Sequence, residues 1–209
     1  MTDFLLDGPE DAPRRLLLAH GAGAAMDSAA MTAAAGALAA TGLRVARFEF
    51  AYMAARRTGG RAGPQRAEAV MPEYLAAVDA LGPGAPLVIG GKSMGGRVAS
   101  MVADGLHAAG RIAGLLCLGY PFHPPGRPAQ LRTAHLERLA TPALIVQGTR
   151  DPFGTRDEVA GYALSPAIEI LWVEDGDHDL RPCKRVTGVG AAEAMAAVAS
   201  RVRDWAAAR

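Results

Sequence analysis

Residues 87–98, Leu-Val-Ile-Gly-Gly-Lys-Ser-Met-Gly-Gly-Arg-Val, constrain the fold of this chain more than any other stretch. The apolar run at 87–89 is typical of a buried strand, and a helix-like segment begins at Met94. Between them, the residues from Gly91 to Gly95 match the pattern G-x-S-x-G. We therefore predict a strand that turns sharply into a helix, with Ser93 at the turn. Gly91 and Gly95 are required because side chains there would collide with the neighbouring strand and helix.

The same letters include Gly-Lys-Ser, which also ends a phosphate-binding P-loop. The P-loop pattern, G-x-x-x-x-G-K-[ST], would use Gly91 as its second glycine and requires another glycine at position 86. That position is Pro86, and the strand-like residues that follow it leave no room for a glycine-rich loop. The pattern therefore favours a nucleophile elbow, a turn that exposes the Ser93 hydroxyl, over a phosphate cradle.

Composition narrows the class of protein. The chain has 209 residues, 50% of them hydrophobic, which is enough for one well-buried core. A formal net charge of +1 gives no strong field for nucleic acid or an anionic membrane. The N-terminal segment lacks the features of a signal peptide, and the apolar runs are too short to span a bilayer. We predict a cytoplasmic protein without nucleic-acid or membrane partners, and the sequence leaves a homodimer open.

Apolar runs and helix-like segments alternate along the chain. The predicted strands are 16–19, 43–50, 87–89, 112–118, 143–146 and 167–173, and the predicted helices are 28–40, 65–81, 94–108, 157–162 and 191–207. This alternation predicts a mostly parallel sheet with helices on both faces, in a single domain over residues 1–209. Ligand sites on such sheets lie outside the carboxyl ends of the strands.

Two residues that could activate Ser93 follow predicted strands at that edge. A serine hydroxyl needs a base to remove its proton, usually a histidine held by a buried carboxylate. Asp151 follows the strand at 143–146, and His178 follows the strand at 167–173. We expect His178 Nε2 within about 3.5 Å of Ser93 Oγ. The competing carboxylates, which rank below Asp151, are Asp157, Asp175 and Asp177.

An oxyanion formed during attack on an acyl carbon requires backbone donors that are already in place. One predicted donor is the N–H of Met94, the residue after Ser93. The second is the N–H of Ala22 in the glycine-containing loop 20–24, with Gly23 as the alternative. Four further side chains follow strand ends and are predicted to line the acyl or alcohol pocket: Tyr52, Tyr120, Phe122 and His123.

The remaining charged residues give weaker signals. The spacing of Asp175, Asp177 and Asp179 is that of a calcium loop, but Leu180 and Val186 stand where glycine and glutamate are required. We therefore predict no metal and no cofactor. A set of basic residues near the elbow or a strand end is compatible with an anionic substrate and equally with burial or simple solvation; these are Lys92, Arg56, Arg57 and Arg97.

With Ser93, Asp151 and His178 in this order, and the His20-Gly21 loop before them, the chain resembles the α/β-hydrolase superfamily over nearly its whole length. It is most similar to small members of the dienelactone-hydrolase and esterase kind. The runs Gly-Lys-Ser-Met-Gly-Gly-Arg and Leu-Gly-Tyr-Pro-Phe-His-Pro-Pro-Gly look like those of bacterial hydrolases related to a vertebrate testis-expressed protein and to a subunit of a chromatin-modifying complex.

The resemblance implies a single-domain α/β-hydrolase fold without a cap domain, because the chain between Gly119 and the strand at 143–146 is too short for one. It also implies a serine hydrolase that cleaves a small carboxylic ester or thioester through an acyl-enzyme (EC class 3.1). Some relatives act as scaffolds, so the alternative function is a binding or interaction module that keeps the fold without useful catalysis.

Overall fold

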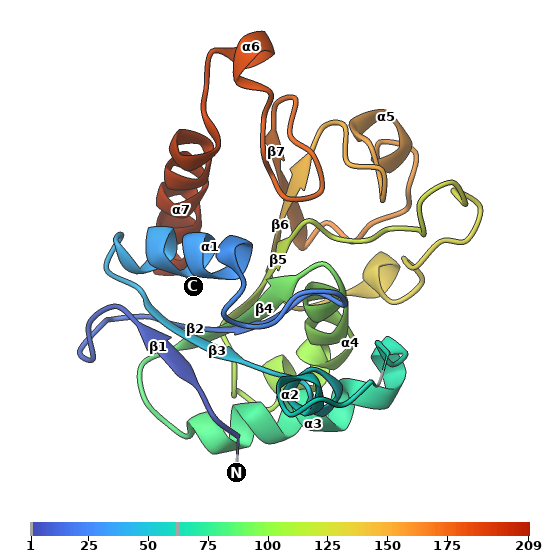
Figure 1. Cartoon of the computed structure of the whole chain (residues 1–209). Coiled ribbons are helices and arrows are strands. Elements are labelled where there is room, and N and C mark those ends of the chain that lie inside the picture. The colour runs from blue at the N-terminus through green and yellow to red at the C-terminus, as the bar shows by residue number, and fades with distance from the viewer. Residues whose placement is uncertain (1, 62) are drawn as a thin grey trace.

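A seven-stranded sheet forms the centre of the computed structural model, which describes residues 2–61 and 63–209 (Figure 1). The strands are β1 (Leu5–Asp7), β2 (Arg15–Ala19), β3 (Arg44–Phe48), β4 (Leu87–Lys92), β5 (Gly114–Leu118), β6 (Ala143–Gly148) and β7 (Ile168–Val173). The helices are α1 (Ala29–Ala39), α2 (Ala51–Arg57), α3 (Ala67–Leu81), α4 (Met94–Ala108), α5 (Arg156–Val159), α6 (Lys184–Thr187) and α7 (Ala191–Ala207), with a 3-10 helix, η1, at Leu136–Arg138.

The order of the strands in the sheet creates the crevice that holds the candidate site. That order is β1-β3-β2-β4-β5-β6-β7, and every neighbouring pair is parallel except β1 with β3. The chain therefore leaves β2 toward one side of the sheet and reaches β4 on the other. In such sheets, this switch in direction opens a crevice at the carboxyl ends of the two strands. Ala19, the last residue of β2, pairs there with Gly91 of β4.

Helices cover both faces of the sheet, which explains why the central strands are mostly apolar. All residues of β5 and β6 are buried, as expected for parallel strands with helices on either side. Figure 1 shows α1 and α7 on one face and α3 and α4 on the other. The buried residues form two clusters, one on each face: one combines strand side chains with those of α2, α3 and α4, the other with those of α1 and α7. The predicted α/β class, a mostly parallel sheet with helices on both faces, is confirmed.

The structure differs from the sequence prediction at the shortest elements. The predicted strand 43–50 ends at Phe48, and Phe50 is instead the extended residue before α2. Helices α2 and α6 and strand β1 were not predicted, since each has seven residues or fewer and lacks a clear period. Between β5 and β6, the chain forms only η1 as regular structure, so no cap covers the crevice. In the part of the chain that the structure describes, no helix has both the length and the apolar character that crossing a membrane requires.

Candidate active site

Ser93 lies at the sharp turn between β4 and α4. Its backbone adopts φ 51° and ψ −115°, a conformation that residues with a side chain rarely adopt. The turn is held by a hydrogen bond of 3.0 Å from the Ser93 N–H to the carbonyl of Leu118. A Cβ atom at Gly91 would lie 2.5 Å from the carbonyl oxygen of Ala19, and one at Gly95 would meet the same oxygen. Both glycines are therefore required because β2, β4 and α4 approach closely here, as predicted.

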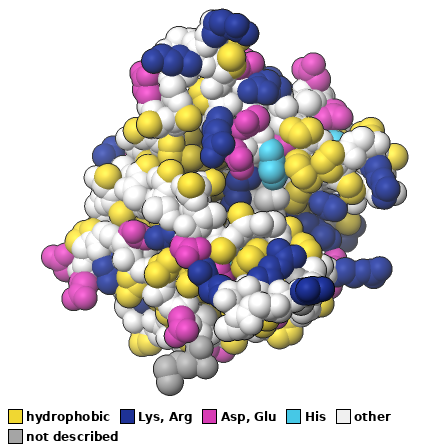
Figure 2. All heavy atoms as spheres, viewed as in Figure 1, with side chains coloured by type: hydrophobic (Ala, Val, Ile, Leu, Met, Phe, Trp, Pro, Cys, Tyr) yellow, Lys and Arg dark blue, Asp and Glu magenta, His cyan; other side chains and the backbone are white. Residues whose placement is uncertain are grey.

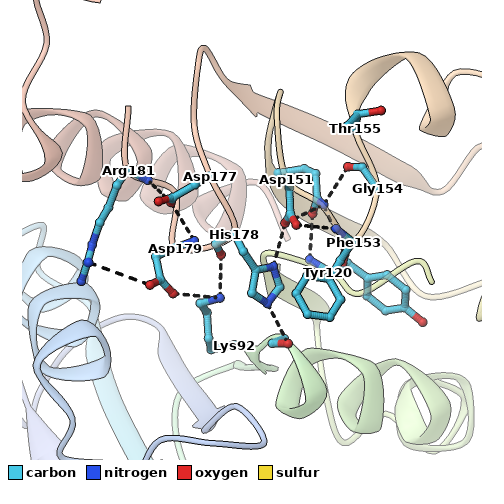
Figure 3. Close-up of polar contacts among 12 residues, drawn as sticks. Lys92, Tyr120, Asp151, Phe153, Gly154, Thr155, Asp177, His178, Asp179 and Arg181 are labelled. Carbon is cyan, nitrogen blue, oxygen red and sulfur yellow. Dashed lines mark hydrogen bonds and ion pairs between the residues drawn. The ribbon is translucent and has the colours of Figure 1, made fainter. Parts of the chain in front are cut away.

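The side chains of Ser93, His178 and Asp151 form a continuous relay of hydrogen bonds (Figure 3). The Ser93 Oγ lies 2.9 Å from His178 Nε2, and His178 Nδ1 lies 2.8 Å from Asp151 Oδ2. Because a carboxylate only accepts hydrogen bonds, Nδ1 donates to Asp151 and Nε2 is left to accept the Ser93 hydroxyl. The three residues come from the loops or turns after β4, β6 and β7, so the carboxyl edge of the sheet brings them together.

Asp151 has no exposed surface, and three donors satisfy its carboxylate. Besides His178, they are the backbone N–H of Phe153, 2.8 Å from Oδ1, and Nε2 of Gln147, 2.9 Å from Oδ2. Gln147 is itself buried in β6, and its Oε1 accepts the N–H of Tyr120 at 2.8 Å. Gln147 is not among the predicted site residues; its only signal in the sequence is an amide at the end of an apolar strand, four residues before Asp151.

Two of the competing carboxylates, Asp175 and Asp177, have other roles. Asp175 accepts a hydrogen bond from the N–H of Cys183, and Asp177 accepts from the N–H groups of Asp179 and Arg181. They organise the loop that carries His178 and do not contact its imidazole. Within the described residues, no group of three or more His, Cys, Asp or Glu side chains is placed to hold a metal ion.

Lys92 links the elbow to the loop that carries His178 (Figure 3). Its Nζ donates a hydrogen bond of 2.6 Å to the backbone carbonyl of His178 and lies 3.4 Å from Asp179 Oδ1. Burial lowers the pKa of Lys92, and the charge of Asp179 opposes this effect. In the sequence, Lys92 is compatible with an anionic substrate, with burial and with simple solvation; in the structure, its ammonium group has partners within the protein.

The loop after β2 contains the predicted second oxyanion donor, Ala22. His20 at its start has no exposed surface, and its Nε2 accepts the N–H of Phe50 at 3.1 Å. The proton is therefore on Nδ1, which donates to the carbonyl of Gly21 at 2.6 Å. Burial lowers the pKa of His20, in keeping with this neutral form. Since the Gly21 carbonyl and the Ala22 N–H belong to one trans peptide, this bond turns the Ala22 N–H away from His20.

A cavity of about 580 Å³ opens beside Ser93. Ala22 and Met94, the two residues predicted to supply oxyanion donors, both line it, together with Pro121 and Phe153. Gly23, the alternative donor, is exposed and is not among the lining residues. A second cavity of about 610 Å³ lies at the opposite edge of the sheet, where Leu87 begins β4, and contains none of the relay residues.

The side chains predicted to line the substrate pocket lie elsewhere. Tyr52, Tyr120, Phe122 and His123 are each no more than 2% exposed, and none lines the cavity beside Ser93. Three of them, the two tyrosines and the phenylalanine, belong to the core cluster on the α3 and α4 face. Both tyrosines can be buried because their hydroxyl groups have hydrogen-bond partners. The Tyr52 hydroxyl donates to the carbonyl of Ala22, and the Tyr120 hydroxyl donates to the carbonyl of Arg132. A residue after a strand end can turn inward and pack beneath a loop, and position in the sequence alone does not distinguish that placement from one that lines a cavity.

Known proteins share this architecture. A family model described as an alpha/beta hydrolase domain matches residues 12–207 of the chain. A lidless α/β serine hydrolase from Xanthomonas campestris is 21% identical, with 98% of this chain and 89% of that chain covered and a TM-score of 0.72. A dienelactone hydrolase from Anabaena variabilis is 20% identical, with 98% and 90% covered and a TM-score of 0.70. The esterase domain of a Rhodothermus marinus protein is 16% identical, with 99% and 98% covered and a TM-score of 0.67. The predicted resemblance to lidless members with this fold is confirmed.

Proposed function

Because the chain belongs to the α/β-hydrolase family, we propose that it is a serine hydrolase in which Ser93 is the nucleophile, His178 the general base and Asp151 the carboxylate that orients the imidazole. The observation that carries this proposal is the relay of hydrogen bonds from Ser93 Oγ through His178 to Asp151, at 2.9 and 2.8 Å. The strained backbone of Ser93 supports it, since such strain gathers at sites where a reactive group must be held in place.

The first half of the proposed reaction forms an acyl-enzyme. His178 Nε2 takes the hydroxyl proton as Ser93 Oγ attacks the carbonyl carbon of the substrate. The oxyanion that develops is stabilised by the backbone N–H groups of Met94 and Ala22. The imidazolium, paired with Asp151, then gives its proton to the departing alcohol or thiol, and the Ser93 ester remains.

The second half releases the acid. His178 takes a proton from a water molecule, which attacks the acyl carbon, and returns that proton to Ser93 Oγ as the ester breaks. We propose a small carboxylic ester or thioester as the substrate, since the cavity beside Ser93 has no cap domain above it. The shared fold with an esterase domain and a dienelactone hydrolase supports this class.

Labelling with a fluorophosphonate probe, followed by kinetics on acyl p-nitrophenyl esters and acyl thioesters, tests the proposal. We expect the wild type to label and Ser93→Ala to lose labelling, with kcat/KM lower by at least about 10³-fold. Ser28→Ala is the matched control, because Ser28 caps α1 away from the cavity. If the wild type fails to label and Ser93→Ala behaves like it, the hydrolase proposal is wrong and the chain is a binding module.

A further inference from the structure

The charged side chains that line the cavity beside Ser93 are mostly basic. Arg66, Arg97 and Arg132 all line it, against Glu68 as the one acidic lining residue, which leaves a formal charge of +2. They come from three separate segments: the residue before α3, the first turn of α4, and the loop between β5 and η1. On the face drawn in Figure 2, Lys and Arg side chains lie around the histidine visible near its centre, together with acidic and hydrophobic ones.

Arg97 is only partly satisfied by the protein. Its Nη2 pairs with Glu68 Oε1 at 2.7 Å, but its buried Nε has no hydrogen-bond partner among the described residues. Burying such a donor without a partner is unfavourable, so native structures usually satisfy it. Because Arg97 lines the cavity, an acceptor on a bound molecule would supply the partner that its Nε lacks within the protein.

Arg132 adds a second guanidinium group that no carboxylate neutralises directly. Within the described residues, it forms no ion pair, whereas its backbone carbonyl is held by the Tyr120 hydroxyl at 2.9 Å. Burial lowers the pKa of Arg132, the nearby charge of Arg97 lowers it further, and the charge of Glu68 opposes these effects without forming an ion pair with Arg132. The two guanidinium groups therefore repel each other, and an anion between them would remove that repulsion.

Two helices also begin at this cavity. Ala67 is the first residue of α3 and Met94 the first of α4, and both line it. The N–H groups of a first helical turn have no partners within the helix, and the helix dipole favours negative charge there. At α3, the negative charge of Glu68 in the first turn already interacts with this end of the helix. The α4 end adds to the attraction of Arg97 and Arg132 for an anion.

We propose that the cavity binds an anionic group of the substrate, a carboxylate or a phosphate, between Arg97 and Arg132 while the scissile carbonyl lies at Ser93. This inference rests on the proposed function and narrows it: the substrate is an ester or thioester whose acyl or alcohol part carries a negative charge. The planar guanidinium groups suit the paired oxygens of both anions.

Mono-p-nitrophenyl glutarate, which is anionic, and its neutral methyl ester of similar length form the test pair. We expect Arg132→Gln to lower kcat/KM for the anionic ester by about 10- to 100-fold, mostly through KM, and to change the neutral ester by less than about twofold. Arg132→Lys should recover part of the loss. Arg127→Gln is the matched control, because Arg127 is exposed in the same loop and does not line the cavity. Equal losses on the two esters, or no loss on either, would overturn the proposal.

A binding experiment separates this inference from the hydrolase proposal. Glutarate, inorganic phosphate and neutral glutaramide are titrated into the Ser93→Ala protein by calorimetry. We expect glutarate or phosphate to bind and glutaramide not to bind. Arg132→Gln should weaken the binding of the anion, and Arg127→Gln should not. The anion that binds more tightly shows whether the site prefers a carboxylate or a phosphate. Absence of anion binding, or equal weakening by both variants, contradicts the anion site. Failure of Ser93 to label, by contrast, contradicts only the proposed catalysis.

Discussion

At the scale of single residues, Lys92 is the side chain whose contribution the sequence left most open. It is next to Ser93 in the chain, yet its ammonium group binds the backbone of His178 and pairs with Asp179. One side chain thus holds the turn with the proposed nucleophile against the loop with the proposed base. Lys92 is in this sense a positioning residue, because it acts on the reaction through His178.

Lys92→Met should therefore lower kcat by about 10- to 100-fold and leave KM nearly unchanged, because displacement of a reacting group by about 1 Å can cost this much. The rate of fluorophosphonate labelling should fall in parallel. Lys92→Arg, which keeps the donor, should recover part of kcat. The matched control is Lys184→Met, an exposed lysine of α6. A kcat for Lys92→Met equal to that of the control would contradict the positioning role.

At the scale of elements, local patterns predicted what depends on local geometry. The strand, elbow and helix around Ser93 follow from glycine spacing and apolar periodicity, and α4 has the bounds that were predicted. Strand β1 and helix α2 depend on contacts with distant elements: β1 pairs only with β3, and Phe50 is held at the start of α2 by the buried His20. The contacts of Gln147 with Tyr120 and of Lys92 with His178 likewise join residues far apart in the chain, so no spacing rule could predict them.

The hydroxyl group of Tyr74 connects helix α3 to the sheet by hydrogen bonds. Tyr74 is fully buried, and its hydroxyl accepts the N–H of Gly90 at 2.9 Å and lies 2.7 Å and 3.0 Å from the carbonyls of Gly90 and Leu17. The hydroxyl therefore contacts both β2 and β4, and its partner in β4, Gly90, is three residues before Ser93 in the chain. Its ring packs edge-on against Phe48, with the centroids 5.1 Å apart.

Tyr74→Phe should lower the free energy of unfolding by about 1–3 kcal/mol, because the buried hydrogen bonds of the Tyr74 hydroxyl would be lost while the ring still packs. Urea denaturation measures the change. Tyr162→Phe is the matched control, since the buried Tyr162 hydroxyl has no hydrogen-bond partner among the described residues, and we expect almost no change there. Equal losses of stability in the two variants would show that the bonds of Tyr74 contribute nothing.

At the scale of the whole molecule, two histidines couple the stability of the fold to pH. His20 joins the loop after β2 to Phe50, and His135, before η1, lies 2.8 Å from the hydroxyl of Ser100 in α4. Burial lowers the pKa of both below the ordinary value of 6.5. Both are therefore protonated more readily in the unfolded chain than in the folded one. The effect of these histidines on stability differs from that of Glu158. Hydrogen bonds from Thr155 lower the pKa of Glu158 below 4.5, so the stability that Glu158 contributes is lost only in more acidic solution.

The sign of the pH dependence follows from these directions. Above about pH 6.5, both histidines are neutral in the folded and the unfolded chain, and the full stability is present. As the pH falls below that value, the unfolded chain takes up more protons than the folded chain does, and stability is lost. We expect the free energy of unfolding, measured with urea, to be lower at about pH 5.5 than at about pH 7.5. His135→Gln should reduce this difference, whereas His107→Gln, a histidine near the end of α4, serves as the control for removing an imidazole. A free energy of unfolding that stays constant over this range, or that falls as steeply in His135→Gln as in the wild type, would contradict the proposed coupling.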